Sequence, residues 1–214
     1  MSGTCSTYLK SLQCNLIPTV MKNILLILGH PSENSFCNAL LDAYRKGAEI
    51  EGANCKTIYI SRLDFDVNLS DGYKTETAIQ LEDDLIESQK LILWADHVVI
   101  AYPNWWGFMP AITKGFIDRI LMPGFAFKHH SGKIFPEKLL HGKSLRLLIT
   151  MDTPKWWFYL IYRASQYQIL KDIVFGYVGF DPVRFSTFGF MRKATDRQRE
   201  NWLKKVTQLG KKFK

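Results

Sequence analysis

Two adjacent tryptophans and a glycine stand in one short polar segment, Pro103-Asn104-Trp105-Trp106-Gly107-Phe108. The segment directly follows a strongly apolar run, so we expect it to be a loop at the end of a buried strand. Trp side chains there favour a wall against a flat aromatic ring, and a glycine lets backbone N–H groups approach the ring edge closely. The same aromatic residues could instead be core or dimer contacts.

A second candidate loop, residues 29–35, follows the first apolar run and precedes a helical pattern. Ser35 is placed to cap that helix, whose free backbone N–H groups and dipole would suit the phosphate or pyrophosphate of a flavin, and His30 could add a donor. The loop has neither the G-x-G-x-x-G nor the G-x-x-x-x-G-K-[ST] spacing, which disfavours the Rossmann fingerprint and the nucleotide-triphosphate loop. The alternative is that Ser35 only caps the helix and that His30 pairs with backbone carbonyls.

A third loop contains Thr150, Met151, Asp152, Thr153 and Pro154. Its polar groups could hydrogen-bond the pyrimidine side of a flavin, where negative charge develops on reduction. It could equally be a proline-containing turn in which Asp152 caps the next helix.

These loops need a scaffold that brings them together. Runs 24–28, 98–102 and 145–150 are short and continuously apolar, as in strands of a parallel sheet that is buried on both faces. The more alternating runs 55–61 and 183–190 predict strands nearer the sheet edges. Helical patterns cover 36–51, 79–95, 111–121 and 156–174, with Ile79, Ile86 and Leu93 expected to face the sheet.

The strand–helix alternation predicts an α/β fold. Specifically, we expect a flavodoxin-like doubly wound parallel five-stranded sheet in the order 2-1-3-4-5, with helices on both faces. Ligands of such sheets bind outside the carboxyl ends of the strands, where the three loops would meet. A final helix should begin with a capping box at Thr195 and Gln198 and pack on the domain through Trp202, Val206 and Leu209.

Composition limits the function classes. A chain of 214 residues with 47% hydrophobic and 22% charged residues predicts one globular domain. We expect residues 1–21 to be an N-terminal extension outside the fold and 22–214 to be the flavin-binding domain. The four cysteines Cys5, Cys14, Cys37 and Cys55 form no C-x-x-C pair, which favours a reducing, cytoplasmic location without a metal site.

The formal net charge of +8 is concentrated at the end of the chain. Residues 192–214 hold nine Lys and Arg against Asp196 and Glu200, which gives a net charge of +7 there. A solvated helix face explains this excess, so we expect no nucleic-acid partner, although the face could bind polyanions or an acidic partner.

Five stretches together resemble the flavodoxin-like NAD(P)H:quinone oxidoreductases, a family that includes DT-diaphorase-like enzymes, bacterial drug-activity modulators and ancillary subunits of potassium-efflux systems. They are residues 28–31 (LGHP), 35–36 (SF), 102–107 (YPNWWG), 110–115 with its Pro-Ala and Lys-Gly pairs, and 123–127 (PGFAF). The resemblance runs from about Met21 to the C-terminus.

The resemblance implies a homodimer with a bound flavin, FAD or alternatively FMN. It also implies ping-pong hydride transfer from NAD(P)H to a quinone-like acceptor, and an open aromatic pocket of this kind would also admit azo or nitro compounds. By position, the cofactor-binding residues would be His30, Ser35, Phe36, Cys37, Pro103, Asn104, Trp105, Trp106, Gly107, Thr150, Met151, Asp152 and Thr153. Phe127, Lys128 and His129 would border the acceptor pocket from the partner subunit.

The chain departs from this family where mammalian-type members have a Tyr and a His that relay charge. Phe158 and Ala164 stand there, and Tyr159 is the candidate catalytic substitute, although one helical step turns it by about 100°. An alternative function is a regulatory subunit that docks on a membrane transporter and retains some reductase activity; the basic final helix favours it. Membrane contact is expected only in that case. A one-electron carrier fits poorly, because carriers of this fold are usually acidic.

Overall fold

The computed structural model describes residues 21–69, 72 and 81–214. Nearly all of the expected extension 1–21, including Cys5 and Cys14, lies outside the described residues, and so does the expected helix start at Ile79.

Five parallel strands form one sheet in the order β2-β1-β3-β6-β7. Their bounds are β1 Asn23–Leu28, β2 Asn54–Tyr59, β3 His97–Pro103, β6 Ser144–Thr150 and β7 Val183–Phe188. Counting only the strands of this sheet gives the order 2-1-3-4-5, which confirms the predicted flavodoxin-like topology. The three continuously apolar runs are the central strands β1, β3 and β6, and the two alternating runs are the edges.

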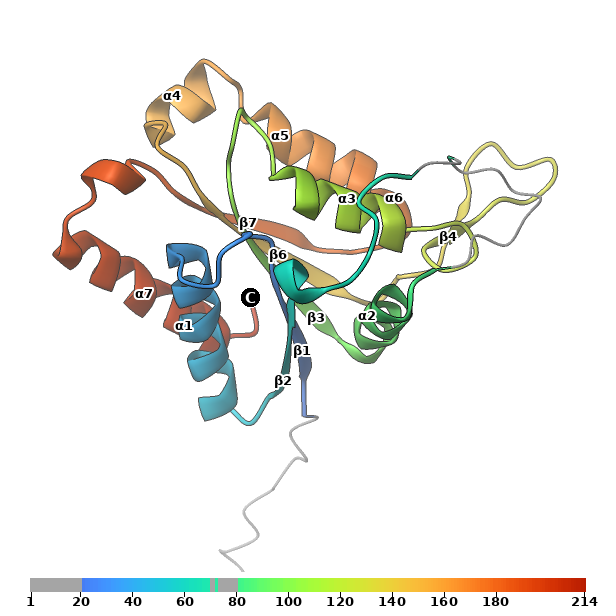
Figure 1. Ribbon diagram of the computed structural model, residues 1–214, viewed down its shortest axis with the longest axis horizontal. Coiled ribbons are helices and arrows are strands. Elements are labelled where there is room, and N and C mark those ends of the chain that lie inside the picture. Colours follow the sequence, from blue (N-terminus) through green and yellow to red (C-terminus); the bar gives the residue numbers. More distant parts are fainter. Residues whose placement is uncertain (1–20, 70–71, 73–80) are drawn as a thin grey trace, which may run out of the picture.

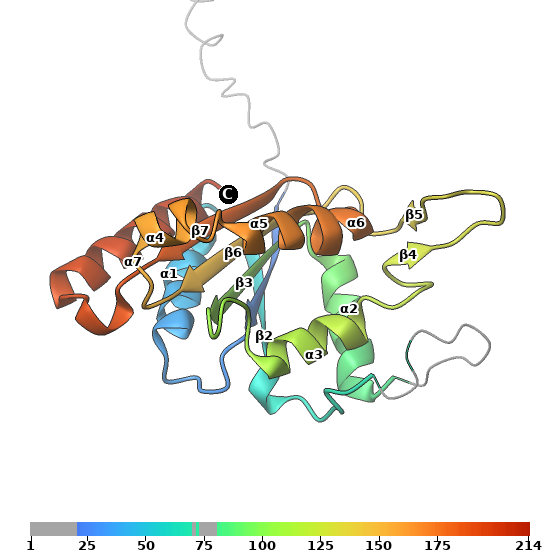
Figure 2. The same cartoon turned by 90° about the horizontal axis from the view of Figure 1, so that it is seen from above.

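Helices cover both faces of the sheet (Figure 1). On one face lie α1 (Phe36–Ile50) and α7 (Asp196–Lys211), packed against inward side chains such as Leu26, Val99 and Leu148. On the other lie α2 (Asp83–Trp94), α3 (Ala111–Ile120), α5 (Ser165–Gln168), the π-helix η2 (Ile169–Phe175) and α6 (Gly176–Val178). Figure 2 shows the two helical layers with the sheet between them.

The helices α1 and α7 approach each other closely through two glycines. A Cβ added at Gly47 would lie 2.0 Å from the Thr207 carbonyl oxygen, and one at Gly210 would lie 2.1 Å from the Tyr44 carbonyl oxygen. The final helix begins with the predicted capping box: the Thr195 side chain accepts from Gln198 N, and the Gln198 side chain accepts from Thr195 N. It packs on the domain through the fully buried Val206, as expected.

The predicted inward stripe of α2 is wrong. Ile86 is 38% exposed and Leu93 55% exposed, whereas Leu85, Ser88 and Ile92 face the sheet. The helix carries apolar residues at adjacent positions, such as Leu85 with Ile86 and Ile92 with Leu93. Two apolar stripes with the same heptad spacing are therefore present, turned by about 100° from each other, and the spacing alone does not decide which one faces the sheet.

The expected continuous helix 156–174 is also wrong. It is divided into α4 (Lys155–Leu160) and the α5–η2 segment, with Arg163 and Ala164 in left-handed backbone conformation at φ 51° and 46°. Ala164 N donates to the Phe158 carbonyl at 3.0 Å, which turns the chain back after α4. No glycine or proline marks this break, so the sequence pattern does not reveal it.

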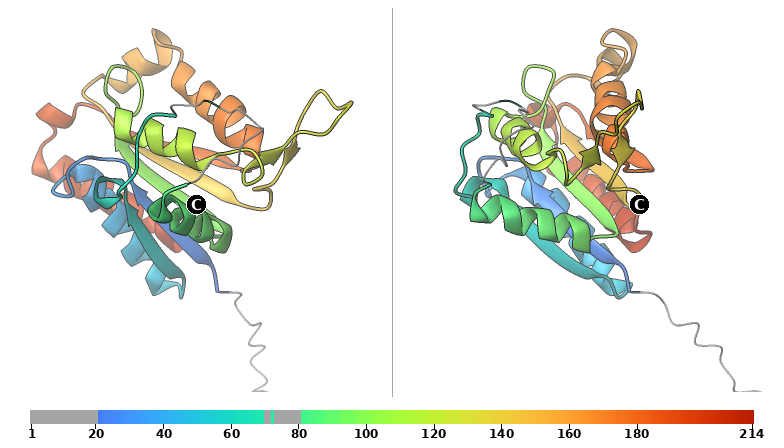
Figure 3. Two further views of the ribbon diagram at one scale, coloured as in Figure 1. Left: turned by 45° about the vertical axis from the view of Figure 1, so that its right-hand side comes forward. Right: turned by 90° about the vertical axis from the view of Figure 1, so that its right-hand side faces the viewer.

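A two-stranded arm of β4 (Phe127–Lys128) and β5 (Glu137–Lys138) extends beyond the helical layers (Figure 3). Two short 3₁₀ helices, η1 (Ile60–Arg62) and η3 (Met191–Lys193), complete the elements of the described chain. None of the helices in this part of the protein is long and apolar enough to cross a membrane.

Candidate functional site

The three loops meet at the carboxyl ends of β1, β3 and β6. Asn104 N donates to the Thr150 carbonyl at 2.7 Å, which joins the second loop to the third. The His30 ring lies edge-on to the Trp105 ring, with centroids 5.9 Å apart, which joins the first loop to the second. The topology therefore gathers the predicted residues from three segments that lie far apart in the sequence.

The second loop is a tight turn. Trp105 N donates to the Phe108 carbonyl at 2.8 Å, and Phe108 N donates back to the Trp105 carbonyl at 3.1 Å. Trp106 and Gly107 at the tip have positive φ angles of 53° and 84°, a conformation that glycine adopts readily and tryptophan rarely does. The turn holds the Trp106 side chain fully exposed, while Trp105 is half-buried.

A cavity of about 570 Å³ lies beside this turn. Its walls come from the second loop, the third loop and the α4–α5 region: Asn104, Trp106, Gly107, Thr153, Phe158, Tyr162, Ser165 and Gln166. Four of these were predicted as cofactor-binding residues (Asn104, Trp106, Gly107, Thr153). Tyr162, Ser165 and Gln166 were not identified, although a glutamine inside a mainly apolar segment was a usable signal.

Two buried oxygen atoms of the cavity-lining residues lack a hydrogen-bond partner within the described part of the chain. They are Asn104 Oδ1 and Gln166 Oε1. The amide nitrogen of Gln166 donates to the Tyr102 hydroxyl at 3.1 Å, which orients the amide and leaves its oxygen without a partner. Burial raises the pKa of Tyr102 well above its usual value, so its hydroxyl stays protonated. Because a buried acceptor without a donor is costly, the pair predicts a ligand with N–H or O–H donors.

The start of α1 provides a second polar feature. The Ser35 side chain accepts from Asn38 N at 3.4 Å, and the first-turn amides of Phe36 and Cys37 stand at the positive end of the helix. The His30 Nδ1 atom accepts from Ser32 N at 2.9 Å. Burial lowers the pKa of His30, so the ring is mainly neutral at pH 7 and can present Nε2–H as a donor.

Other selected residues do not face the cavity. The Asp152 carboxylate accepts from Arg192 N at 2.8 Å and forms an ion pair with Arg192 Nε at 2.9 Å. Met151 is buried, and the Pro103 and Thr150 side chains belong to strand ends inside the sheet. The Tyr159 ring packs on Tyr167, with centroids 6.0 Å apart, and is not among the residues that line the cavity.

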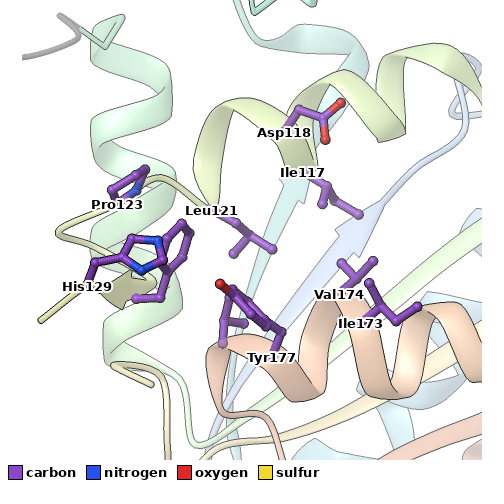
Figure 4. Close-up of a pocket in the computed structure, with 10 residues that line it drawn as sticks. Ile117, Asp118, Leu121, Pro123, His129, Ile173, Val174 and Tyr177 are labelled. Atoms are coloured by element: carbon purple, nitrogen blue, oxygen red, sulfur yellow. The ribbon is translucent and has the colours of Figure 1, made fainter. Parts of the chain in front are cut away.

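Phe127 and His129 line a different hollow, of about 410 Å³, between α3 and the η2–α6 segment. Figure 4 shows Ile117 and Leu121 on the α3 side of it and Val174 and Tyr177 on the helical segment opposite, with His129 beside Pro123. Lys128 is exposed beside it. Within one chain, the three residues predicted for the acceptor pocket therefore do not adjoin the cavity at Trp106.

The cavity and the N-terminus of α1 together fit a flavin. A space of about 570 Å³ is in the range of small-molecule sites, its walls include aromatic rings, and Asn104 and Gln166 offer the acceptors that a ring with N–H groups requires. The α1 terminus fits the phosphate end. Among the described residues, no group of His, Cys, Asp and Glu is arranged to hold a metal ion.

The profile of the family described as having a flavodoxin-like fold matches residues 22–209, and the chain belongs to that family. It is 27% identical over 190 residues to an uncharacterized NAD(P)H oxidoreductase of Haemophilus influenzae, a match that covers 87% of this chain and 93% of the relative. It is 30% identical over 127 residues to NAD(P)H dehydrogenase [quinone] 1 of Cavia porcellus, covering 51% of this chain and 46% of that protein. Among solved structures, Smu.1420 of Streptococcus mutans UA159 matches with a TM-score of 0.75 and 27% identity, covering 89% of this chain and 99% of the other.

Proposed function

We propose that this protein is an NAD(P)H-dependent flavin oxidoreductase that reduces quinones by two electrons. The observation that carries the proposal is the cavity at the carboxyl ends of the strands, with Trp106 and Gly107 on one wall and two buried oxygens without partners in its lining. The activities for which the relatives from Haemophilus influenzae and Cavia porcellus are named support the same chemistry.

A bound flavin supplies the hydride chemistry, and the protein supplies binding, orientation and a water-poor environment. Gly107 would leave room for the ring edge, and Asn104 and Gln166 would accept hydrogen bonds that fix its orientation. Ser35 and the first-turn amides of α1 would hold the phosphate end. The buried Phe158 and the half-exposed Tyr162 limit the access of water to the reacting face.

We propose that NAD(P)H and the acceptor use the cavity in turn, which gives ping-pong kinetics. The cavity has a volume of about 570 Å³ and aromatic side chains in its lining, which suits planar acceptors, so azo and nitro compounds should also be reduced. FAD is the proposed cofactor, with FMN as the alternative. The free cysteines Cys37 and Cys55 support a reducing cytoplasmic location.

A homodimer is part of the proposal. Phe127, Lys128 and His129 lie in and beside an arm that extends from the body (Figure 3), where it can reach a second copy. In the dimer these residues would border the acceptor side of the partner's cavity, a place they do not occupy within one chain.

The direct test is anaerobic reduction of the purified protein after saturation with FAD or FMN. We expect a bound flavin whose visible absorbance is bleached by NADH or NADPH and restored by a quinone. A protein that binds neither flavin would overturn the proposal. A protein that binds flavin but is not bleached would favour the regulatory-subunit alternative, which the exposed basic face of α7 supports and which co-purification with a transporter would test.

A further inference from the structure

A run of exposed aromatic and aliphatic side chains extends from Trp156 to Tyr162, a stretch we call the aromatic segment. Six of its seven residues are more than a third exposed, with Leu160 at 71% and Trp156 at 56%, and only Phe158 is buried. Scattered exposed apolar residues are ordinary on a protein surface, whereas six within seven positions are not.

The aromatic segment projects from the rim of the molecule. Figure 1 shows α4 at the outer rim, above the carboxyl ends of the strands. The chain reverses direction immediately afterwards at Arg163 and Ala164, so the segment stands off the sheet and does not pack along it. Trp156 and Trp157 contact each other edge-on at 5.4 Å, and Trp157 contacts Tyr162 at 6.4 Å, so the rings form one cluster.

The charges around the segment have one predominant sign. Lys155 and Arg163 bound it, and no acidic residue lies between them. The neighbouring Asp152 carboxylate is already paired with Arg192. Lys155 also lies near Lys205 of the basic helix α7: burial, with a smaller contribution from Lys205, lowers its pKa. The segment is therefore flanked by an excess of cations.

Trp and Tyr rings beside Leu and Ile, with Lys and Arg at the margins, are the composition of a segment that lies in the interface of a lipid bilayer. Cationic margins are complementary to anionic lipid headgroups. We propose that residues 155–163 form an interfacial anchor that docks the protein on an anionic bilayer surface.

Docking would place the cavity at the bilayer. Phe158 and Tyr162 belong both to the aromatic segment and to the cavity wall, so the entrance would face the lipid, where apolar long-chain quinones dissolve. This assignment of a membrane-dissolved quinone as the acceptor rests on the proposed function, whereas the docking itself does not.

The test is co-sedimentation of the full-length, flavin-saturated protein with two kinds of vesicles, phosphatidylcholine alone and an equal mixture of phosphatidylcholine and phosphatidylglycerol. We expect binding to the mixed vesicles that weakens at high salt. Leu160→Ser should reduce this binding about tenfold or more, because it removes one inserted side chain. Arg163→Glu should reduce binding to the mixed vesicles to a similar extent, about tenfold, and leave any binding to phosphatidylcholine alone unchanged.

Leu93→Ser is the matched control, since Leu93 is 55% exposed on α2, far from the segment, and it should bind as the unmodified protein does. Three results would overturn the inference. One is no sedimentation with the mixed vesicles. Another is vesicle binding that is unchanged in both Leu160→Ser and Arg163→Glu, which would show that the basic face of α7 binds the vesicles instead. The third is loss of a dimer in light scattering for Leu160→Ser without vesicle binding by the parent protein, which would show that a second copy covers the segment. Because no electron transfer is measured, failure here is distinct from failure of the proposed activity.

Discussion

The Cys37 sulfur lies 3.4 Å from the Thr150 hydroxyl oxygen. This contact joins the first turn of α1 to the last residue of β6, so the proposed phosphate end and the third loop are held by one buried interaction. Burial raises the pKa of the Cys37 thiol to about 11, which keeps it protonated and excludes a thiolate at neutral pH.

Replacing Thr150 by Val removes the hydroxyl at nearly constant volume. We expect the free energy of unfolding to fall by about 0.5–1.5 kcal/mol, because the buried thiol loses its partner. Urea denaturation measures this. An unchanged midpoint would show that the contact contributes nothing to stability.

Trp106→Ala tests the proposed ring wall. The Trp106 side chain is fully exposed, so its loss should leave the stability of the flavin-free protein within about 0.5 kcal/mol. Flavin affinity should fall by about tenfold or more, because an aromatic contact with the bound ring is lost. Trp156→Ala is a matched control outside the cavity lining, and equal losses of affinity in both variants would contradict the assignment.

Gln166→Leu tests the acceptor in the cavity. It removes both the Oε1 atom that lacks a partner and the donor to Tyr102, whereas Tyr102→Phe removes only the latter hydrogen bond. We expect both variants to lose about 1 kcal/mol of stability.

Gln166→Leu should in addition weaken flavin binding by about tenfold, whereas Tyr102→Phe, which keeps Oε1 and loses only the bond that orients the amide, should weaken it less. Titration of both proteins with FAD and FMN checks this. If Tyr102→Phe weakened binding equally, the effect would come from the packing behind the cavity and not from Oε1.

We expect the protein to lose stability in acid because of the buried His97. It is buried at the start of β3, where its Nδ1 atom lies 2.7 Å from Ser144 Oγ and its ring stacks on Tyr44. Burial, with smaller contributions from Arg146 and Arg184, lowers its pKa to about 3. Between pH 6.5 and 3 the unfolded chain therefore binds a proton that the folded protein does not, so stability is present above pH 6.5 and is lost as the pH falls.

The contribution of His97 to this slope is at most about 1.4 kcal/mol per pH unit. His97→Phe, which retains a ring against Tyr44, should flatten the dependence of unfolding free energy on pH between 4 and 6. Thermal denaturation across that range measures it. A slope equal to that of the unmodified protein would assign the acid sensitivity to other groups.

The central strands, their order and the three loops could be predicted because continuous apolar runs have few structural alternatives in an α/β chain. Asn104, Trp106 and Gly107 could be placed beside the cavity for the same reason: polar and aromatic side chains directly after β3 must emerge at the carboxyl edge of the sheet. Gln166 and Tyr162 could not be placed, since they reach the cavity only through the left-handed break at Arg163 and Ala164. The direction of Asp152 was likewise set by Arg192, 40 residues later in the chain.

The close contact between Gly47 and the Thr207 carbonyl has a consequence for biosynthesis. The outer side of the first helix is covered by the last one, so a nascent chain cannot complete its domain until residues near the C-terminus have left the ribosome. Loss of even the final two turns of α7 would expose α1, the first helix to be synthesised. A truncated product would then present the uncovered α1 to chaperones and proteases.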